Sequence, residues 1–507
     1  MNYGAILTTI YDIWLDSRFF AILKAIWRPF KRAYDNLALV KFLRRGDGVQ
    51  SAFERSLFAR IERFIFDIIT RFFALISRAL SAAWNGSAAV RICSGSFILN
   101  YEFLLGAFIC VMFIAPHENW NNAYAIAGAI GFLVLYLILA GCGKRPLLHP
   151  DKLGLPLALF GIALVVSLLF TNTMSDSLRI LSFFIAAFAL CYTIAADITD
   201  TQKLDKLLAF IYAAVILTAV YAIAQIRLGL VTPDVLLTDV NLSVSTPARA
   251  TSTLDNPNNY AEFLVLFMPL CAAFAGSRKD MRLSVLLAIG LVIPAVAMVL
   301  TYSRSGWVSL MLAAFVYVWL RNKKLIPAFI VIVIIAFPLV PSSVRERLTS
   351  TITSYRSSGY IDSSTGHRLL LWQGVRYMIH DRGLTGIGLG PAAFAEVYRN
   401  YAVQGAQDGV AHAQSQFYEI IIETGVLGLV TFIWLMLRTV KNCVMARRGA
   451  GRTAKLVLIA CASSFTGIVF SFLVEYVWFY PRCLFAYFIL LGISYAAINI
   501  ADKEKAE

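Results

Sequence analysis

The chain has 507 residues, of which 59% are hydrophobic and 15% are charged, and its mean hydropathy is +0.71. A water-soluble globule of this composition would expose too much apolar surface, so the sequence predicts a membrane protein. The net charge of +15 does not indicate nucleic-acid binding, because the basic residues flank apolar segments, where they would face anionic lipid headgroups and set topology. We therefore expect membrane lipids, and no nucleic acid, as partners.

Residues 1–96 form a separate basic region. Aromatic and aliphatic residues recur at helical spacing in two stretches, Phe19 to Phe30 and Phe58 to Phe73, with arginines and lysines between them. This pattern is typical of basic amphipathic helices that lie on the cytoplasmic surface of a membrane. A helical hairpin that packs on the membrane domain or on a partner protein fits the pattern equally well.

Twelve apolar segments follow this region. Because a helix needs about 20 residues to cross a ~30 Å hydrocarbon core, the shorter segments would require tilt or a thinner bilayer. The predicted fold class is an all-α polytopic membrane protein with about twelve transmembrane helices. The segments lie near 97–116, 123–141, 153–171, 178–196, 205–226, 258–276, 283–301, 306–320, 325–341, 416–437, 455–474 and 482–500. Helices 1–9 thus occupy 97–341, an extracytoplasmic loop subdomain 342–415, helices 10–12 416–500, and a cytoplasmic tail 501–507.

Basic residues cluster in loops that fall on alternate turns of this pattern. Lysine and arginine are retained on the cytoplasmic side, so the pattern predicts a multi-pass protein of the bacterial cytoplasmic (inner) membrane with both termini in the cytoplasm. Asp197 and Asp200 fall on the same side, where we interpret them as solvated loop charges. The basic loops are Lys144–Arg145, Arg278–Arg282, Arg321–Lys324 and Arg438–Lys455.

The loop before the tenth segment is long enough to form a subdomain. Its pattern predicts a helix from Arg368 to His380, a glycine-rich turn from Gly383 to Pro391 and a further helix from Ala392 to Tyr401. Gly386-Ile387-Gly388-Leu389-Gly390 resembles a phosphate-binding loop only superficially. It follows no strand of a βαβ unit, so we do not expect nucleotide binding.

Three arginines lie on the side away from the basic loops: Arg249, Arg304 and Arg368. Planar guanidinium groups bind phosphate oxygens bidentately and stay charged near a membrane, so three converging arginines could hold a diphosphate. Alternatively, each arginine could reach a lipid phosphate or cap the carbonyl end of a helix.

His412 precedes the tenth segment, and Glu419 and Glu423 follow it. An imidazole titrates near neutrality and could take a proton from a sugar hydroxyl, although a histidine at a helix entrance is often a capping group. Neither an HExxH motif nor a CxxC spacing among the eight cysteines is present. We therefore expect no metal site and no disulfide framework.

Several motifs together carry a family resemblance. They are Asn256-Pro257-Asn258, Ser303-Arg304, Gly366-His367-Arg368, Trp372, Gly383 to Gly390, Phe394, His412, Glu423-Thr424-Gly425 and Gly428. Through them, about residues 100–500 resemble the superfamily of O-antigen ligases and O-antigen polymerases. The resemblance implies a bundle of about a dozen helices whose active site faces the periplasm and uses no nucleotide, metal or other cofactor.

The resemblance also implies roles for individual residues. His412 would be the base that activates the acceptor hydroxyl, while Arg249 and Arg304 would bind the undecaprenyl diphosphate leaving group. Arg368 would help to position this group, with Asn258 and Glu423 in support. One departure concerns the histidine motif, because many members have His-Ala-His-Asn where this chain has His412-Ala413-Gln414-Ser415. A relay role for a second histidine is therefore in doubt.

These implications lead to an expected activity in cell-surface polysaccharide biosynthesis. The chain would be an inverting, metal-independent membrane glycosyltransferase that moves a glycan from a polyprenyl diphosphate-linked donor to a hydroxyl of a lipid, protein or glycan acceptor. A polymerase that joins repeat units on the same carrier would share these residues. A transporter or flippase of lipid-linked sugars is a third possibility, but it predicts ionisable residues at the membrane midplane, whereas Glu262 and Glu475 fall near the outer ends of segments.

Overall fold

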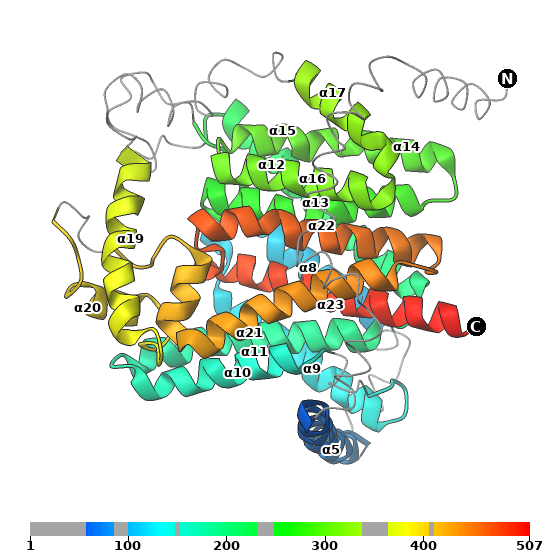
Figure 1. The fold of residues 1–507 in the computed structure, drawn as a ribbon. Coiled ribbons are helices and arrows are strands. Elements are labelled where there is room, and N and C mark those ends of the chain that lie inside the picture. Colours follow the sequence, from blue (N-terminus) through cyan, green and yellow to red (C-terminus); the bar gives the residue numbers. More distant parts are fainter. Residues whose placement is uncertain (1–56, 86–99, 148–152, 231–247, 337–362, 405–409) are drawn as a thin grey trace.

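The computed structural model describes residues 57–85, 100–147, 153–230, 248–336, 363–404 and 410–507. Within these ranges every element of regular secondary structure is a helix, and Figure 1 shows the long helices stacked side by side in one bundle. The predicted all-α fold class is confirmed. The α-helices are α5 (Leu57–Asn85), α8 (Tyr101–Ile114), α9 (Asn122–Gly141), α10 (Leu155–Ser167), α11 (Met174–Asp197), α12 (Thr201–Arg227), α13 (Pro257–Ser277), α14 (Met281–Gly290), α15 (Val292–Leu300), α16 (Arg304–Arg321), α17 (Ile326–Ala336), α19 (Ser363–Arg382), α20 (Pro391–Tyr398), α21 (Gln416–Ala446), α22 (Arg452–Val474) and α23 (Pro481–Ala506).

Each of the twelve predicted apolar segments coincides with a helix, or with two consecutive helices, in the described residues. Eight candidate spans are long and apolar enough to cross a membrane: α9, α11, α12, α13, α14 with α15, α21, α22 and α23. The apolar helices α8 and α10 are shorter. An arginine at each end lowers the hydropathy of α16, and α17 has only 11 residues. The chain is a multi-pass membrane protein with eight candidate spans among the described residues, and the total of twelve crossings stays a prediction.

The loops of the bundle gather at two ends. At one end, which we call the basic end, the Arg452 guanidinium donates to the Gly276 carbonyl at 2.9 Å and Arg447 donates to the Leu320 carbonyl at 3.2 Å. Helices α19 and α20 lie at the opposite end, which we call the loop end (Figure 1). The basic loops therefore share one end, as the alternating pattern predicts. The side of the membrane that each end faces stays a prediction.

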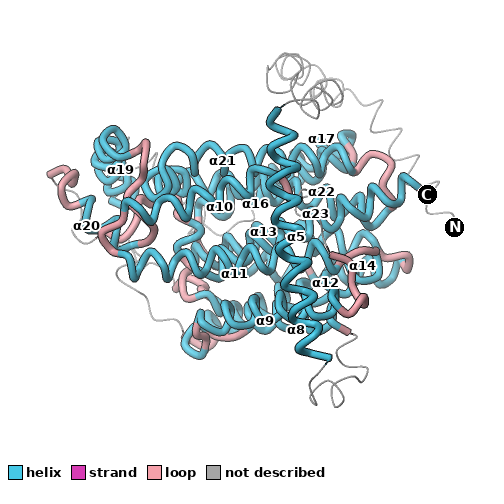
Figure 2. The backbone as a smooth tube through the Cα atoms, turned by 90° about the horizontal axis from the view of Figure 1, so that it is seen from below, coloured by secondary structure: helices cyan, strands magenta, loops and turns pink. Residues whose placement is uncertain are grey.

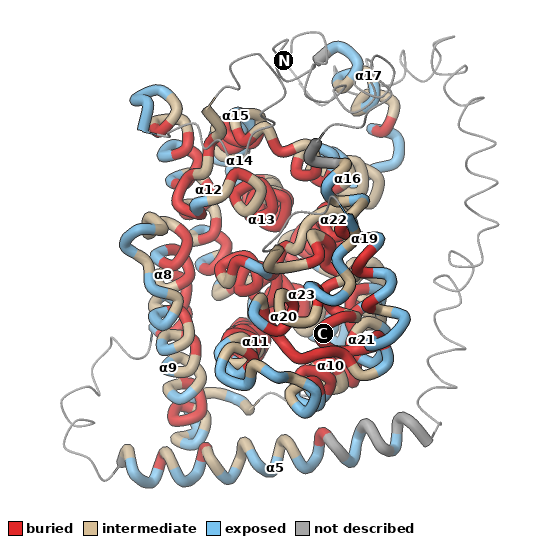
Figure 3. Tube along the Cα trace, turned by 90° about the vertical axis from the view of Figure 1, so that its left-hand side faces the viewer, coloured by how far each residue is buried: buried red, intermediate tan, exposed pale blue. Residues whose placement is uncertain are grey.

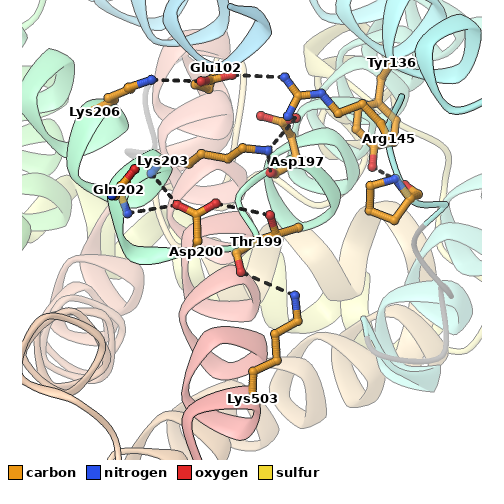
Figure 4. Close-up of polar contacts among 11 residues, drawn as sticks. Glu102, Tyr136, Arg145, Asp197, Thr199, Asp200, Gln202, Lys203, Lys206 and Lys503 are labelled. Carbon is orange, nitrogen blue, oxygen red and sulfur yellow. Dashed lines mark hydrogen bonds and ion pairs between the residues drawn. The ribbon is translucent and has the colours of Figure 1, made fainter. Parts of the chain in front are cut away.

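A cluster of charged side chains joins four parts of the chain at the basic end (Figure 4). Arg145 lies between two carboxylates, 3.1 Å from Glu102 of α8 and 3.0 Å from Asp197 of α11. Lys206 of α12 contacts Glu102 at 3.0 Å, and Lys203 lies 3.7 Å from Asp197. Removing one partner would leave a buried charge uncompensated, so this cluster fixes how α8, α11 and α12 pack.

The prediction that Asp197 is a solvated loop charge is wrong. Its side chain is fully buried, because the connection from α11 to α12 is so short that the last residue of α11 stays within the bundle. Its neighbour Asp200 is exposed as predicted. Asp200 has a structural role as the N-cap of α12, because its carboxylate accepts the backbone N–H groups of Gln202 and Lys203, both at 2.9 Å.

Helix α5 lies crosswise to the long helices, along the flank of the bundle near its basic end (Figure 2, Figure 3). One face of α5 packs on the membrane domain. The Ser77 hydroxyl donates to the Leu137 carbonyl of α9 at 2.6 Å, and the rings of Phe73 and Tyr192 stack with centroids 5.0 Å apart. The second predicted amphipathic stretch is therefore confirmed as a helix. The first, Phe19 to Phe30, lies outside the described residues.

A second face of α5 has no protein partner among the described residues. Phe64, Ile68, Phe72 and Leu75 recur at helical spacing and are each more than half exposed. A row of exposed arginines flanks this stripe, namely Arg60, Arg63, Arg71 and Arg78. An apolar stripe beside a basic row is the surface that an anionic membrane interface binds, so the predicted placement of α5 on the membrane surface stays compatible with its packing on α9.

Helix α21 is kinked at Gly425, whose φ is 71° and ψ is −175°. The kink releases the carbonyls of Ile422 and Glu423 from the helix, and they accept the N–H groups of Ile387 and Gly388 at 2.9 and 3.3 Å. The glycine segment 383–390 thus pairs with the backbone of α21. This packing accounts for the glycines of the segment, and the absence of nucleotide binding stays a prediction.

Gly425→Ala is expected to destabilise the protein by roughly 2–4 kcal/mol, since it combines backbone strain with overpacking. An added Cβ would lie 2.4 Å from the Leu384 carbonyl oxygen. The folded fraction after heating in detergent, measured by size-exclusion chromatography, tests this. Gly131→Ala is the matched control, because nothing lies within 4 Å of its Cβ position. Equal melting of the two variants would contradict the role given to the kink.

Candidate functional site

Arg249 lies in the loop before α13 and reaches two neighbouring elements. Its Nε donates to the Thr301 carbonyl at the end of α15 at 2.9 Å, and its Nη2 donates to the Asn258 side chain at 3.0 Å. The adjacent backbone N–H of Ala250 donates to the Leu300 carbonyl at 2.9 Å. Arg249 therefore caps a helix carbonyl, as one of the alternatives predicts, and also orients a side chain at the start of α13.

The Asn256-Pro257-Asn258 motif forms the N-terminus of α13. Asn256 is the N-cap, because its side chain accepts the Asn258 N–H at 2.8 Å, and Pro257 occupies the first turn, where the absence of an N–H costs nothing. The Asn258 side chain faces two partners. It accepts from Arg249 and donates to the Glu475 carboxylate at 3.2 Å.

Glu475 links four helices at the loop end of the bundle. Its Oε1 accepts from Arg368 of α19 at 2.6 Å and from Asn258 of α13 at 3.2 Å. Its backbone carbonyl accepts the Gln416 N–H at 3.0 Å, which ties the end of α22 to the start of α21. The Glu475 and Arg368 side chains are 14% and 20% exposed, so a ligand at the surface of the site can reach them.

Arg368 continues this series of contacts to the histidine loop. Its Nε donates to the Gln414 side chain at 3.0 Å. Arg249, Asn258, Glu475, Arg368 and Gln414 are thus joined by consecutive hydrogen bonds, and we call them the arginine network. These five residues come from four segments that lie far apart in the sequence, because only Arg249 and Asn258 are close along the chain.

Arg304 is the first residue of α16, where Ser303 is the N-cap and accepts the Gly306 N–H at 3.3 Å. It follows by three residues the Thr301 carbonyl that Arg249 binds. Helix α16 packs along α22, with the hydroxyls of Ser309 and Ser471 2.8 Å apart. The N-terminus of α16 therefore begins close to the Thr301 carbonyl that Arg249 binds, and it adds the positive end of a helix dipole there.

His412 packs against the rings of Tyr476 and Phe479, whose centroids are 5.7 and 4.5 Å from that of the imidazole. Its Nδ1 accepts the Gln414 backbone N–H at 3.1 Å. A backbone N–H can only donate, so in the neutral imidazole the proton resides on Nε2. His412 thus presents a hydrogen-bond donor. This favours a donor role over the predicted role as a general base.

Burial lowers the pKa of His412 to about 4, and the nearby Arg368 cation adds to the effect. Because the unfolded chain titrates near 6.5, it binds more protons than the folded protein between these values, and stability falls as the pH falls from 6.5 towards 4. His412→Gln should remove this loss, roughly 2 kcal/mol at pH 5. Thermal unfolding in detergent at pH 7 and pH 5 tests it.

The matched control for this experiment is His380→Gln in α19, because the His380 side chain is 87% exposed. We expect its melting temperature to fall between pH 7 and pH 5 as much as that of the unsubstituted protein. An equal fall in the His412→Gln variant would show that His412 is not held in the neutral form.

Two buried carboxylates of α21 hold the loops that surround the site. Glu423 accepts the Gly390 N–H at 2.7 Å, and Glu419 accepts the Ala413 N–H at 2.6 Å. The Tyr476 hydroxyl lies 3.4 Å from Glu423, and burial next to these carboxylates raises the pKa of Tyr476 well above its usual value. Glu423 therefore positions the glycine segment, and its role as a supporting residue of the site stays a prediction.

Backbone strain is concentrated around the network. Among the described residues, four that are not glycine have a positive φ: Ser252, Asp255, Tyr302 and Gln414. The first two lie between Arg249 and Asn258, the third precedes Arg304, and the fourth belongs to the network itself. Such conformations cost about 1–3 kcal/mol each and are retained mainly where a site requires them.

The structure thus brings together Arg249, Asn258 and Arg368, with His412 next to Gln414 of the network, while Arg304 follows three residues after the Thr301 that Arg249 contacts. Sequence reasoning missed Glu475, which joins the arginines, and Gln414, which binds Arg368. The sequence did offer one signal for Glu475, because this carboxylate follows directly after an apolar segment, on the same predicted side as the three arginines. Gln414 was noted only as a departure from the histidine motif.

Residues 289–433 match the family model of the O-antigen ligases. This match supports the resemblance to the O-antigen ligase superfamily that the sequence motifs indicate. No curated protein matches the chain. The O-antigen ligase match begins in α14 and ends in α21, and it includes Arg304, Arg368, His412 and Glu423.

The other part of the arginine network lies outside the O-antigen ligase match. Arg249 and Asn258 precede it and Glu475 follows it, yet direct hydrogen bonds connect Asn258 and Glu475 to Arg368 inside it. The matched segment is therefore completed by side chains from both flanks. The match and the apolar helices support a membrane protein with an O-antigen ligase or polymerase type of function, and hence lipid-linked glycan substrates.

Proposed function

We propose that the chain is an O-antigen ligase-like glycosyltransferase, which moves a glycan from undecaprenyl diphosphate to an acceptor hydroxyl at the outer face of the bacterial cytoplasmic membrane. The observation that carries this proposal is the arginine network, in which residues from both sides of the O-antigen ligase match are joined by hydrogen bonds to Arg368 inside it.

The charge of the site suits a diphosphate. Arg249, Arg304 and Arg368 supply three positive charges and Glu475 supplies one negative charge, while His412 is neutral at pH 7. The difference, three minus one, leaves a surplus of two for a diphosphate diester, which carries about two negative charges. Guanidinium groups and the N-terminus of α16 would stabilise the charge that develops on the leaving oxygen.

Glu475 is the residue that we propose as the proton acceptor. Among the described residues both of its side-chain contacts fall on Oε1, and no hydrogen bond is found on Oε2. Carboxylates serve as general bases in many inverting reactions at sugars. His412 would donate its Nε2–H to an oxygen of the substrate and so replace the base role that the family resemblance implies.

The reaction forms one bond and breaks one. The acceptor oxygen attacks the anomeric carbon from the face opposite the diphosphate, the bond from that carbon to the diphosphate oxygen breaks, and the configuration inverts. Glu475 takes the proton of the hydroxyl, and undecaprenyl diphosphate leaves with the bonding electron pair. No metal or cofactor takes part in this scheme.

Deletion of the gene, followed by analysis of surface polysaccharide and of carrier-linked glycan, tests the proposal. Full-length chains that accumulate on the carrier, with attachment lost, are the result expected of a ligase. Single repeat units on the carrier would instead indicate a polymerase. An unchanged polysaccharide and an unchanged carrier pool would overturn the assignment.

A further inference from the structure

A cavity of about 590 Å³ lies between the first turns of α9 and α11. These turns belong to the loop end, because Asp176 of α11 accepts the Ala392 N–H of α20 at 3.0 Å. The cavity is therefore at the same end of the bundle as the arginine network. Its volume falls within the range of small-ligand sites, about 300–1,000 Å³.

The lining of this cavity combines aromatic rings with groups that donate and accept hydrogen bonds. They are Trp120, Tyr124, Asn119, Asn122, Glu118 and Arg179. Tyr124 is 59% exposed, so it does not serve to fill the core. Aromatic faces pack against the C–H faces of a pyranose ring, and amide, carboxylate and guanidinium groups match its hydroxyls. Arg179 is also bound to Asp176, but a purely apolar ligand would leave the side chains of Asn119, Asn122 and Glu118 unpaired.

A series of contacts connects this cavity to the arginine network. The guanidinium of Arg482, which is fully buried, lies 5.6 Å from the centre of the Trp120 ring and donates to the Tyr480 hydroxyl at 3.0 Å. The Tyr480 hydroxyl is 2.6 Å from Nδ1 of His117, whose Nε2 is 3.6 Å from Asp255. Asp255 directly precedes the N-cap of α13, where the network begins.

We propose that this cavity binds sugar residues of a substrate at a distance from the diphosphate. The inference rests on the proposed function and deepens it, since it assigns a second contact to a glycan whose reacting end lies at the arginines. The same sugar chemistry could belong to the donor or to the acceptor, and the experiment separates the two.

The experiment uses the full-length protein in nanodiscs, with the lipid-linked glycan and the acceptor fraction extracted from the deletion strain. Tyr124→Ala and Trp120→Ala should raise the KM for one of the two substrates about tenfold and leave kcat within about twofold. The substrate whose KM rises identifies the source of the sugar. Tyr377→Ala is the matched control, because Tyr377 is an exposed tyrosine of α19, outside the cavity.

Trp120 also contacts Arg482, so Tyr124→Ala keeps the test valid if Trp120→Ala fails to fold. Unchanged KM values for both substrates in Tyr124→Ala would overturn the inference. Independently of transfer, glycan released from the carrier by mild acid should slow hydrogen exchange of residues 118–126 in the unsubstituted protein and not in Tyr124→Ala. If added phospholipid headgroup slows exchange there and glycan does not, the cavity is a lipid site and the inference fails.

Discussion

Arg304→Ala should lower kcat/KM for glycan transfer by about 10²–10³-fold, the loss typical of removing one preorganised charge-stabilising group. The reason is that diphosphate leaves readily only when cations neutralise its developing charge. Arg304→Lys should recover part of this loss, because it restores the charge but not the bidentate geometry. The rate is measured with purified protein in nanodiscs and lipid-linked glycan.

Arg376→Ala is the matched control for Arg304→Ala, because Arg376 is an exposed arginine of α19 without a contact in the network. We expect its rate to match that of the unsubstituted protein. His412→Ala should cost less than Arg304→Ala, because electrostatic stabilisation outweighs a single hydrogen bond. Equal losses in these two variants, or full activity of Arg304→Ala at normal protein levels, would contradict the proposed mechanism.

Glu475→Gln should lower kcat by about 10²–10⁴-fold, as expected when a general base is lost. A glutamine preserves an acceptor oxygen for Asn258 but can neither take the proton nor neutralise Arg368. Single-turnover rates with a fixed acceptor concentration measure this effect. Glu396→Gln in α20 is the control, since Glu396 contacts only Asn172 among the described side chains, at 3.3 Å.

A loss in Glu475→Gln could also arise because Arg368 is no longer held in place. A double-mutant cycle with Arg368→Met separates the two explanations. If Glu475 acts as the base, the two losses should be roughly additive. If it only positions Arg368, the double variant should be no worse than Arg368→Met alone, and the assignment of the proton to Glu475 would then be wrong.

Much of the fold follows from the hydropathy pattern. The positions of the apolar helices, the helices of the loop before α21 and the glycine turn between them could all be predicted, because each depends on local periodicity or on glycine. Hydropathy does not fix the number of helices that cross the membrane, because α16 carries an arginine at each end and α17 has only 11 residues. Hydropathy treats such helices in the same way whether they cross a bilayer or lie against other helices.

The candidate site could be predicted only in part. The three arginines were identifiable because guanidinium groups on the side away from the basic loops need a reason to be there. The position of Glu475 at the end of an apolar segment was visible in the sequence, but its role was not, because that role depends on α13, α19 and α22 meeting in space. Asp197 illustrates the same difficulty, because a position near a loop does not reveal that the side chain points into the bundle.

The crosswise orientation of α5 affects how the protein sits in lipid. A helix that crosses the long helices, with an apolar stripe beside a row of arginines, suits the boundary between hydrocarbon and headgroups, where we predict that α5 lies. Because its other face packs on α9, α5 in this position would fix the depth of one end of the bundle in the bilayer. In a thicker or thinner membrane, the difference between the bilayer thickness and the hydrophobic length of the bundle would then be accommodated at the opposite end, where α19 and α20 lie.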